Sequence, residues 1–122
     1  MADTITVLEY PRCGTCKKAL KWLQDHDVTY EDRHIVEDNP TKDELGSWIQ
    51  ASGLPIRRFF NTSGRLYREL NMKDRFKEGI SDDECLELLA SDGMLVKRPL
   101  VVGDGFVLVG FKEAEWEDKL VS

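Results

Sequence analysis

The sequence has few cysteines and no long hydrophobic run, and these two absences exclude several classes of protein. Three cysteines in 122 residues are too few, and odd in number, for the disulfide framework of a small secreted domain. The most apolar stretch, GFVLVGF, is far too short to cross a bilayer, and the N-terminus MADTITVLEY lacks a basic leader. We therefore expect a soluble, cytosolic protein that has no membrane partner.

Positive charge is also in deficit. The chain has 17 Lys and Arg against 23 Asp and Glu, which gives a formal net charge of −6. Proteins that bind phosphate backbones do so through broad positive surface, so direct binding of nucleic acid is disfavoured. The length suits one domain with a real hydrophobic core, and no repeat or linker interrupts the chain. We predict a single domain over residues 1–122.

The first third of the chain has the pattern of a strand, a helix and a second strand. Residues 4–8 are rich in β-branched and apolar side chains, which is typical of a strand. Residues 14–27 repeat apolar side chains at three- and four-residue spacing, and residues 28–36 again resemble a strand. Because the connections are short and the crossover is helical, we expect the two strands to be parallel.

The middle of the chain, about residues 41–90, is predicted to be a helical insertion. Thr41 and Glu44 have the spacing of a capping box at the start of one helix. Ser81 and Glu84 have the same spacing near the end of the insertion. We therefore expect helices to begin at both places.

The last part of the chain predicts a hairpin and a closing helix. Residues 100–102 and 106–109 are apolar and β-branched, and they bracket Gly-Asp-Gly at residues 103–105. A helix is expected over about residues 112–120. The order β-α-β, helices, β-β-α predicts an α/β fold, a mixed sheet flanked by helices. A Cys-x-x-Cys pair after the first strand of such a fold is typical of a thioredoxin-like redox protein.

The cysteine pair is the strongest candidate for chemistry. If Cys13 lies where the loop enters the helix, free backbone N–H groups and the helix dipole favour its thiolate. Arg12, Lys17 and Lys18 add positive charge nearby. Cys16, one turn further on, is close enough to form a disulfide with Cys13 and to displace a substrate bound there. This predicts Cys13 as the nucleophile and Cys16 as the resolving cysteine.

Two other interpretations of the pair stay open, a metal site and two ordinary buried cysteines. A zinc site needs two more ligands, but His26 and His34 stand eight residues apart. Cys85 shares the helical spacing of Leu88 and Leu89, so it is expected in the core and chemically inert. Redox chemistry is favoured, and no metal is expected.

A second candidate stretch is Lys97-Arg98-Pro99-Leu100, where a proline opens a strand. Its simplest interpretation is a strand-edge proline beside a solvated arginine. In a thioredoxin-like fold Pro99 would instead be a cis-proline that faces the cysteine loop. Arg98 would then present its guanidinium to an anion bound there.

Several stretches of the sequence resemble the ArsC/Spx family, which groups glutaredoxin-linked arsenate reductases, related thiol reductases and Spx-type transcriptional regulators. The resemblance spans nearly the whole chain and implies a thioredoxin-like fold with a helical insertion, ArsC-like. It also implies that Cys13 is the reactive thiol and Pro99 the cis-proline. The matching stretches are YPRCGTCKKA at 10–19, NTSG at 61–64, YREL at 67–70, LVKRPLV at 95–101 and VGF at 109–111.

The resemblance also has departures that bear on the substrate. Arsenate reductases of this family attack the oxyanion with the cysteine that matches Cys13 and hold it with arginines, of which Arg98 matches one. An ungapped comparison places Asn61 and Gly110 where the other two arginines are expected, and Cys16 where a serine is usual. The residues therefore favour disulfides or glutathione mixed disulfides over arsenate.

The expected activity is that of a thiol-dependent oxidoreductase of the arsenate reductase (glutaredoxin) type. The resemblance implies no bound cofactor, with glutathione or a glutaredoxin as electron donor. Cys13 and Cys16 are the expected catalytic residues. The expected substrate-binding residues are Arg12, Gly14, Thr15, Asn61, Arg98 and Pro99.

The alternative function is a redox-sensing regulator of the Spx type, which binds RNA polymerase rather than DNA. The Cys-x-x-Cys pair and the Arg-Pro motif are common to both functions. Such regulators contact the polymerase through a glycine in the insertion, where an ungapped match gives Pro55 with Gly53 nearby. The chain also lacks the basic C-terminal extension of those regulators, so the enzyme is favoured.

Overall fold

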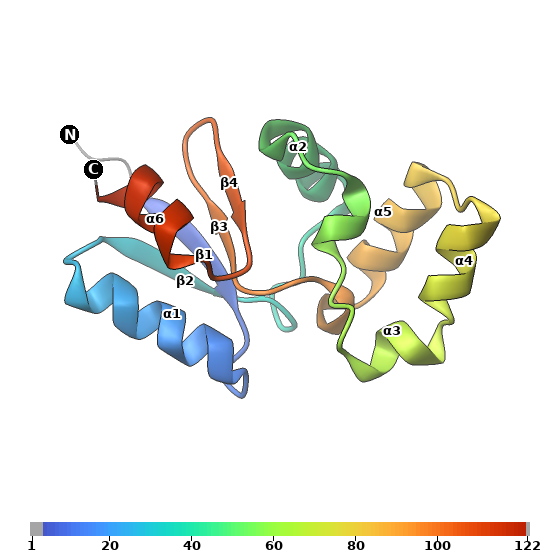
Figure 1. The fold of residues 1–122 in the computed structure, drawn as a ribbon, viewed down its shortest axis with the longest axis horizontal. Coiled ribbons are helices and arrows are strands. Elements are labelled where there is room, and N and C mark those ends of the chain that lie inside the picture. The colour runs from blue at the N-terminus through green and yellow to red at the C-terminus, as the bar shows by residue number, and fades with distance from the viewer. Residues whose placement is uncertain (1–3, 122) are drawn as a thin grey trace.

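Residues 4–121, which the computed structural model describes, form a mixed four-stranded sheet with helices on both sides (Figure 1). The strand order is β2-β1-β3-β4. Strand β1 (Ile5–Glu9) pairs in parallel with β2 (Tyr30–His34) and antiparallel with β3 (Leu100–Val102). The hairpin is completed by β4 (Val107–Val109), antiparallel to β3. The predicted parallel pair and C-terminal hairpin are confirmed, and the fold is thioredoxin-like.

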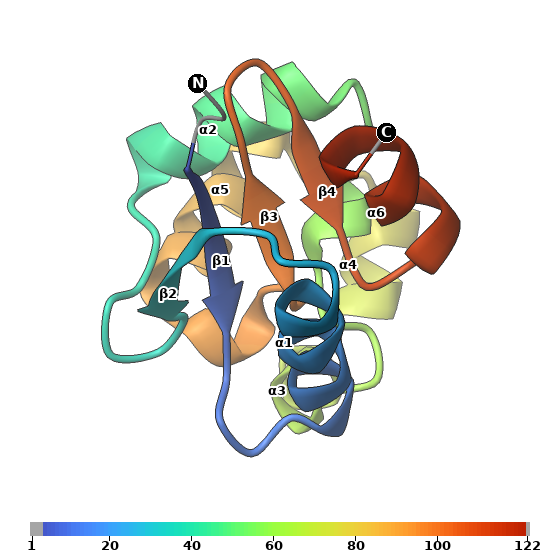
Figure 2. The same ribbon diagram turned by 90° about the vertical axis from the view of Figure 1, so that its left-hand side faces the viewer.

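Two helices, α1 (Gly14–Asp25) and α6 (Glu113–Leu120), cover one face of the sheet. Figure 2 looks onto the sheet from this side, with both helices in front of the strands. Their apolar faces meet the sheet at Val7, and the rings of Trp22 and Trp116 pack edge to face with centroids 5.8 Å apart. This layer fixes the start of α1 at the end of β1.

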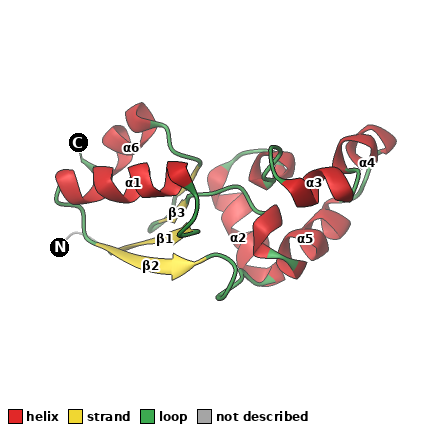
Figure 3. Ribbon diagram, turned by 90° about the horizontal axis from the view of Figure 1, so that it is seen from below, coloured by secondary structure: helices red, strands yellow, loops and turns green. Residues whose placement is uncertain are grey.

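The residues between β2 and β3 form the insertion, whose helices lie beside the sheet in Figure 3. A second core cluster joins the insertion to the sheet, because Phe59 and Phe60 are buried together with Leu8 and Leu100. The insertion was predicted to end near residue 90, whereas its last short helix extends to residue 95. Its elements are α2 (Lys42–Ser52), η1 (Ile56–Phe59), α3 (Arg65–Glu69), α4 (Met72–Glu78), α5 (Asp82–Ser91) and η2 (Gly93–Leu95).

Both predicted helix starts are present. Thr41 and Glu44 form the capping box of α2, since each side chain accepts a hydrogen bond from the backbone N–H of the other at 3.1 and 3.0 Å. Ser81 Oγ accepts from the backbone N–H of Glu84 at 3.2 Å and so caps α5. These short-range patterns determined where the insertion helices begin.

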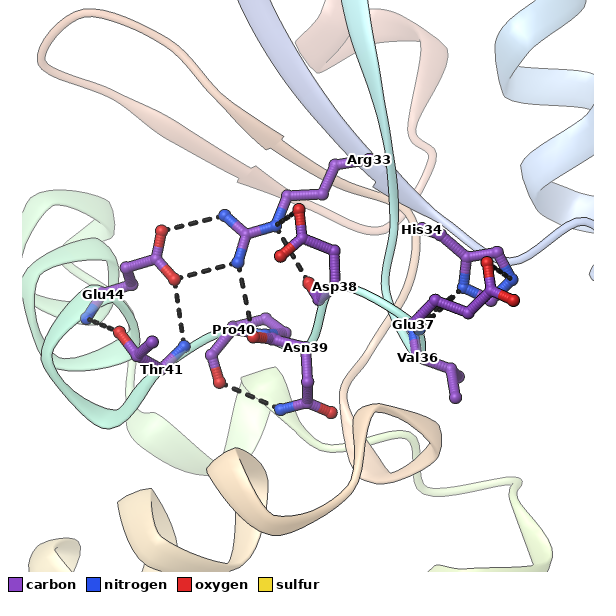
Figure 4. Close-up of polar contacts among 9 residues, drawn as sticks. All are labelled: Arg33, His34, Val36, Glu37, Asp38, Asn39, Pro40, Thr41 and Glu44. Atoms are coloured by element: carbon purple, nitrogen blue, oxygen red, sulfur yellow. Dashed lines mark hydrogen bonds and ion pairs between the residues drawn. The ribbon is translucent and has the colours of Figure 1, made fainter.

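An ion pair connects the sheet to the first turn of α2 (Figure 4). The guanidinium of Arg33, on β2, donates to both carboxylate oxygens of Glu44 at 2.8 and 2.9 Å. Arg33 also donates to the backbone carbonyl of Asp38 at 3.0 Å, in the loop between the two elements. Because Arg33 is mostly buried, this fork holds α2 in one orientation relative to the sheet.

A close backbone contact joins the end of the insertion to the end of β2. Gly93, the first residue of η2, lies so near Ile35 that a Cβ atom on the glycine would overlap the Ile35 carbonyl group. Only glycine allows this approach without a backbone shift. The chain from η2 to β3 therefore begins from a fixed point on the sheet.

Candidate functional site

Cys13 is the N-cap residue of α1 and lies at the end of the loop that follows β1. Its backbone is extended, and its backbone N–H donates to the carbonyl of Tyr10 at 2.9 Å, which closes a tight turn. The Cys13 sulfur accepts a hydrogen bond from the backbone N–H of Cys16 at 3.3 Å. The sulfur thus takes the place of a capping oxygen and satisfies an N–H group that the helix leaves free.

The pKa values of the two cysteines are shifted in opposite directions. Burial alone would raise the pKa of Cys13, but hydrogen bonds from Cys16 and the positive charge of Arg98 outweigh it and lower this pKa below its usual value. Burial, with the hydrogen bond to Cys13, raises the pKa of Cys16 to about 12. Since the thiolate is the nucleophilic form, Cys13 is the activated member and Cys16 holds its proton.

Arg98 lies beside the Cys13 sulfur and is held by the chain that precedes β3. Its Nη1 donates to the carbonyl of Met94 at 3.4 Å, and its guanidinium carbon lies 5.3 Å from the centre of the Tyr10 ring. The Nε atom is buried and has no hydrogen-bond partner among residues 4–121. The Arg98–Pro99 peptide bond is cis, as the resemblance implied. This cation is therefore positioned to contact an anion or a polarised sulfur at Cys13.

A cleft of about 610 Å³ opens beside Cys13, between the insertion and the sheet. Four of the predicted site residues line it, namely Cys13, Thr15, Asn61 and Arg98. Gly110 also lines it, so both positions where family members are expected to have arginine face the same space as the thiol. The site is thus assembled from the start of α1, the insertion and the strand ends.

The other predicted residues are not among the described residues that line the cleft. Gly14 is exposed in the first turn of α1, and Cys16 is fully buried one turn further on. Pro99 is buried at the start of β3. Arg12 is exposed, and it is absent from the described residues that form the cleft wall. The catalytic role of Cys16 and the substrate-binding roles of Gly14, Pro99 and Arg12 stay predictions.

The source of positive charge at the thiol differs from the one expected. Arg12, Lys17 and Lys18 are exposed, and the cation that lowers the pKa of Cys13 is Arg98. The sequence places the first three beside Cys13, but Lys17 and Lys18 lie on the exposed face of α1 and Arg12 is exposed in the turn before it. Arg98 is brought to the sulfur by the antiparallel pairing of β1 with β3.

Four cationic residues of the cleft were not predicted as site residues, although one of them, Lys97, belongs to the candidate stretch at residues 97–100. Arg57 and Arg58 lie on η1, Lys97 precedes Arg98, and Lys112 is the N-cap residue of α6. Arg57-Arg58 is a dibasic pair, the one available signal, but such pairs are common on surfaces. Only the packing of the insertion against the sheet brings these residues to one cleft.

Within residues 4–121, no group of three or more His, Cys, Asp or Glu side chains is arranged to hold a metal ion. Cys85 is fully buried in the core that joins the insertion to the sheet, as predicted. In the same part of the chain, no helix is long and apolar enough to cross a membrane.

A mixed sheet with a helical insertion, a cysteine at the N-cap of α1 and a cis-proline beside it defines a thioredoxin-like protein of the ArsC type. The family model described as "ArsC family" matches residues 8–119, so the chain belongs to the ArsC family. The resemblance inferred from the sequence motifs is therefore confirmed.

Relatives in this family have different names. Bacillus subtilis YusI, named an uncharacterized protein, is 51% identical over 94% of this chain and 97% of its own. A structure of a possible arsenate reductase from Streptococcus mutans is 42% identical, with a TM-score of 0.85 over 95% of this chain and 97% of its own. The Bacillus subtilis regulatory protein MgsR is 28% identical over 94% of this chain and 89% of its own. The family thus includes proteins named as enzymes and as regulators.

Proposed function

We propose that this protein is a thiol–disulfide oxidoreductase in which Cys13 attacks and Cys16 resolves. The observation that supports this most directly is the asymmetry of the pair at the start of α1. The pKa of Cys13 is lowered by Cys16 and Arg98, whereas that of Cys16 is raised to about 12. A thiol that ionises more readily than its partner suits the first attack, and a partner that keeps its proton suits the second of two successive exchange steps.

In the first step the Cys13 thiolate attacks one sulfur of a disulfide substrate. A bond forms between Cys13 and that sulfur, the substrate S–S bond breaks, and the other half leaves as a thiolate that takes a proton from solvent. Once Cys13 is a mixed disulfide, the hydrogen bond and the negative charge that help to hold the proton on Cys16 are lost. Cys16 then attacks Cys13, forms the internal disulfide and releases the bound thiol.

The protein must then be reduced by an external thiol. Two equivalents of glutathione, or one dithiol glutaredoxin, supply the two electrons that return Cys13 and Cys16 to thiols. The half-buried Cys13 faces an open cleft, so an incoming thiol reaches this sulfur first. Cys16 is enclosed and is not a site of direct attack.

Arsenate is a weaker candidate than a disulfide. The cation at the sulfur is Arg98, and the cleft positions where family members are expected to have two further arginines hold Asn61 and Gly110. Gly110 has a φ of 77°, a left-handed conformation that an arginine rarely adopts. A multiply charged tetrahedral oxyanion at the thiol would therefore lack two of the three arginines that family members are expected to use to hold it.

The test is turnover of a small glutathione mixed disulfide in the presence of glutathione, glutaredoxin, glutathione reductase and NADPH, with arsenate assayed in parallel. Cys13→Ser should abolish turnover, because no thiolate is left at the N-cap. Cys16→Ser should accumulate a mixed disulfide on Cys13, detectable by mass spectrometry. Cys85→Ser is the matched control and should keep the wild-type rate, since Cys85 is buried in the core away from the cleft. Equal residual turnover in the Cys13 and Cys16 variants would contradict the assignment.

The second candidate is a redox-sensing regulator that binds RNA polymerase. It is favoured by the similarity to a protein named as a regulator, MgsR, over 94% of this chain. The same cysteine pair would then serve as a switch that mild oxidant closes. Absence of turnover, together with rapid Cys13–Cys16 disulfide formation and retention of the oxidised protein on RNA polymerase, would support the regulator over the enzyme.

A further inference from the structure

Tyr10 borders both cysteines and Arg98, although it is not among the described residues that line the cleft. Its backbone carbonyl accepts the N–H of Cys13 at 2.9 Å, which closes the turn before α1. Burial and the hydrogen bond to Cys13 raise the pKa of Cys16, and a hydrogen bond from the Tyr10 backbone opposes that rise. The guanidinium of Arg98 lies over the Tyr10 ring, with its carbon 5.3 Å from the ring centre. One residue thus contacts the two thiols and the cation beside them.

Strand pairing explains why this position meets Arg98. In the antiparallel pair of β1 with β3, Leu8 lies opposite Leu100. The same register, continued by two residues, sets Tyr10 opposite Arg98. In the parallel pair of β1 with β2, the last residue of β2, His34, lies beside the last residue of β1. Tyr10 therefore follows the middle strand, between the chain segments that carry Arg98 and His34.

Arg98 requires support that does not cancel its charge. None of the ion pairs within residues 4–121 involves Arg98, its hydrogen bond to the Met94 carbonyl is long at 3.4 Å, and its buried Nε has no partner. A carboxylate beside it would offset the positive charge that helps to lower the pKa of Cys13. The negative face of an aromatic ring attracts a guanidinium without adding a counter-charge. The ring thus holds the cation and leaves its charge to the thiol.

The Tyr10 ring is itself held by His34. The two rings pack edge to face, with centroids 5.7 Å apart and planes at 86°. His34 is fixed in turn, because its Nδ1 accepts the backbone N–H groups of Val36 and Glu37 at 3.2 and 3.0 Å (Figure 4). The position of Arg98 therefore depends, through one aromatic ring, on the turn that follows β2.

We propose that Tyr10 is a positioning residue of the thiol site, whose ring holds Arg98 beside the Cys13 sulfur and is held in turn by His34. This rests on the proposed function, in which Cys13 is the attacking thiol. The contacts with Arg98 and His34 are made by the ring, so the hydroxyl group is not required for them. Loss of the ring frees Arg98 to turn away, and the Cys13 thiolate then loses part of its stabilisation.

The test measures alkylation of Cys13 by iodoacetamide as a function of pH, with the modified cysteine identified by mass spectrometry. Tyr10→Leu should raise the pKa of Cys13 and slow its alkylation severalfold at neutral pH, because less of the thiol is ionised. Tyr10→Phe keeps the ring and should reproduce the wild-type profile. The assay requires no substrate, so a protein that turned over no disulfide would still show the effect, and failure of the proposed function is thereby distinguished.

A double-mutant cycle with Arg98→Met shows whether Tyr10 acts through the arginine. In the Arg98→Met background, Tyr10→Leu should cause no further slowing, since the cation that the ring positions is absent. A slowing as large as that in the wild-type background would overturn the proposal, because Tyr10 would then act on the thiol without Arg98.

The matched control is Tyr30→Leu, since Tyr30 is also half-buried but lies at the start of β2, beside Ile5. This variant should keep the wild-type alkylation profile. Equal slowing in Tyr10→Leu and Tyr30→Leu, or no slowing in Tyr10→Leu, would overturn the proposal.

Urea unfolding verifies that each variant is folded under the conditions of the assay. If Tyr10→Leu is unfolded, His34→Leu replaces it in the same cycle, because this change removes the ring that packs against Tyr10. His34→Leu should slow alkylation when Arg98 is present and have no effect in the Arg98→Met background. An equal effect in both backgrounds, or none in either, would overturn the proposal.

Discussion

At the scale of single residues, the reactivity of the protein depends on the hydrogen bonds and the charge that surround the Cys13 sulfur. Cys13 accepts the N–H of Cys16 and lies beside Arg98, and together these interactions exceed the cost of burial. Arg98 in turn is held by the Met94 carbonyl and the Tyr10 ring, so its position depends on neighbours that do not line the cleft. The acidity of the thiol is thus sensitive to a side chain from a distant part of the sequence.

Replacing Arg98 should make Cys13 less acidic. In Arg98→Met the pKa of Cys13 is expected to rise, because the Coulomb attraction and the hydrogen bond to the guanidinium are lost while burial remains. Alkylation of Cys13 by iodoacetamide at neutral pH should slow severalfold, and the pH dependence of that rate measures the pKa directly. Lys18→Met, which removes an exposed cation of α1, should leave the profile unchanged. A shift of equal size in both variants would mean that general charge, not Arg98, sets the pKa.

At the scale of elements, the joint between β2 and α2 determines how the insertion meets the sheet. The Arg33 guanidinium, hydrogen-bonded to Glu44, lowers the pKa of that carboxyl group to about 2. The same carboxylate closes the capping box with Thr41, so one side chain both starts the helix and attaches it to the sheet. Loss of this side chain therefore removes two contacts at once.

Arg33→Met should reduce stability by about 1 kcal/mol at pH 7, less than the pKa shift implies, because the Glu44 side chain is 36% exposed to screening solvent. Since the folded-state pKa is depressed, the stabilisation is present above about pH 4.5 and is lost as the pH falls toward 2. Urea unfolding between pH 4.5 and pH 2 should show that the difference in free energy of unfolding between the wild type and Arg33→Met becomes smaller.

A suitable control for the joint is Lys21→Met, because Lys21 forms an ion pair with Asp25 on the exposed face of α1. Both side chains of that pair are more than half exposed, so this change should have almost no effect on stability at any pH. If the curves for the Arg33 and Lys21 variants coincided, the joint between β2 and α2 would have no special energetic role.

The sequence predicted the elements well because their signals are local. Thr41 and Glu44 stand three residues apart and specify a helix start without help from the rest of the chain. Cys13 was identified for the same reason, since strand, turn and helix follow each other directly. Arg57 and Lys112 were missed because they become neighbours only when the insertion packs on the sheet, and no short pattern records that packing. The sequence therefore predicts the nucleophile of the site but not the cationic residues of the cleft wall.

At the scale of the whole molecule, one buried carboxyl group couples folding to pH. Glu9, at the end of β1, is only 5% exposed, and burial together with the nearby Asp32 raises its pKa to about 7. The folded state therefore binds a proton more tightly than the unfolded chain does. Stability from this group is full below about pH 4.5 and declines as the pH rises toward 7.

Glu9→Gln should remove this dependence. Near pH 8 the variant is expected to be more stable than the wild type by about 2 kcal/mol, since no charge has to be buried, and near pH 4 the two should be alike. Urea unfolding at several pH values provides the measurement. Glu31 is exposed on β2, so the stability of Glu31→Gln should change with pH in the same way as that of the wild type. If the stability of the Glu9 variant also changed with pH as the wild type does, this carboxyl group would not control the pH dependence.

The contact between Gly93 and the Ile35 carbonyl also has a consequence for protein engineering. The chain leaves that contact and, within a few residues, places Arg98 beside the thiol, with the Met94 carbonyl accepting a hydrogen bond from its guanidinium. A library built to change substrate preference can vary the cleft wall at Arg57 or Lys112, where side chains are exposed. At position 93 such a library has no freedom, because even one added carbon would displace the segment that holds Arg98 beside Cys13.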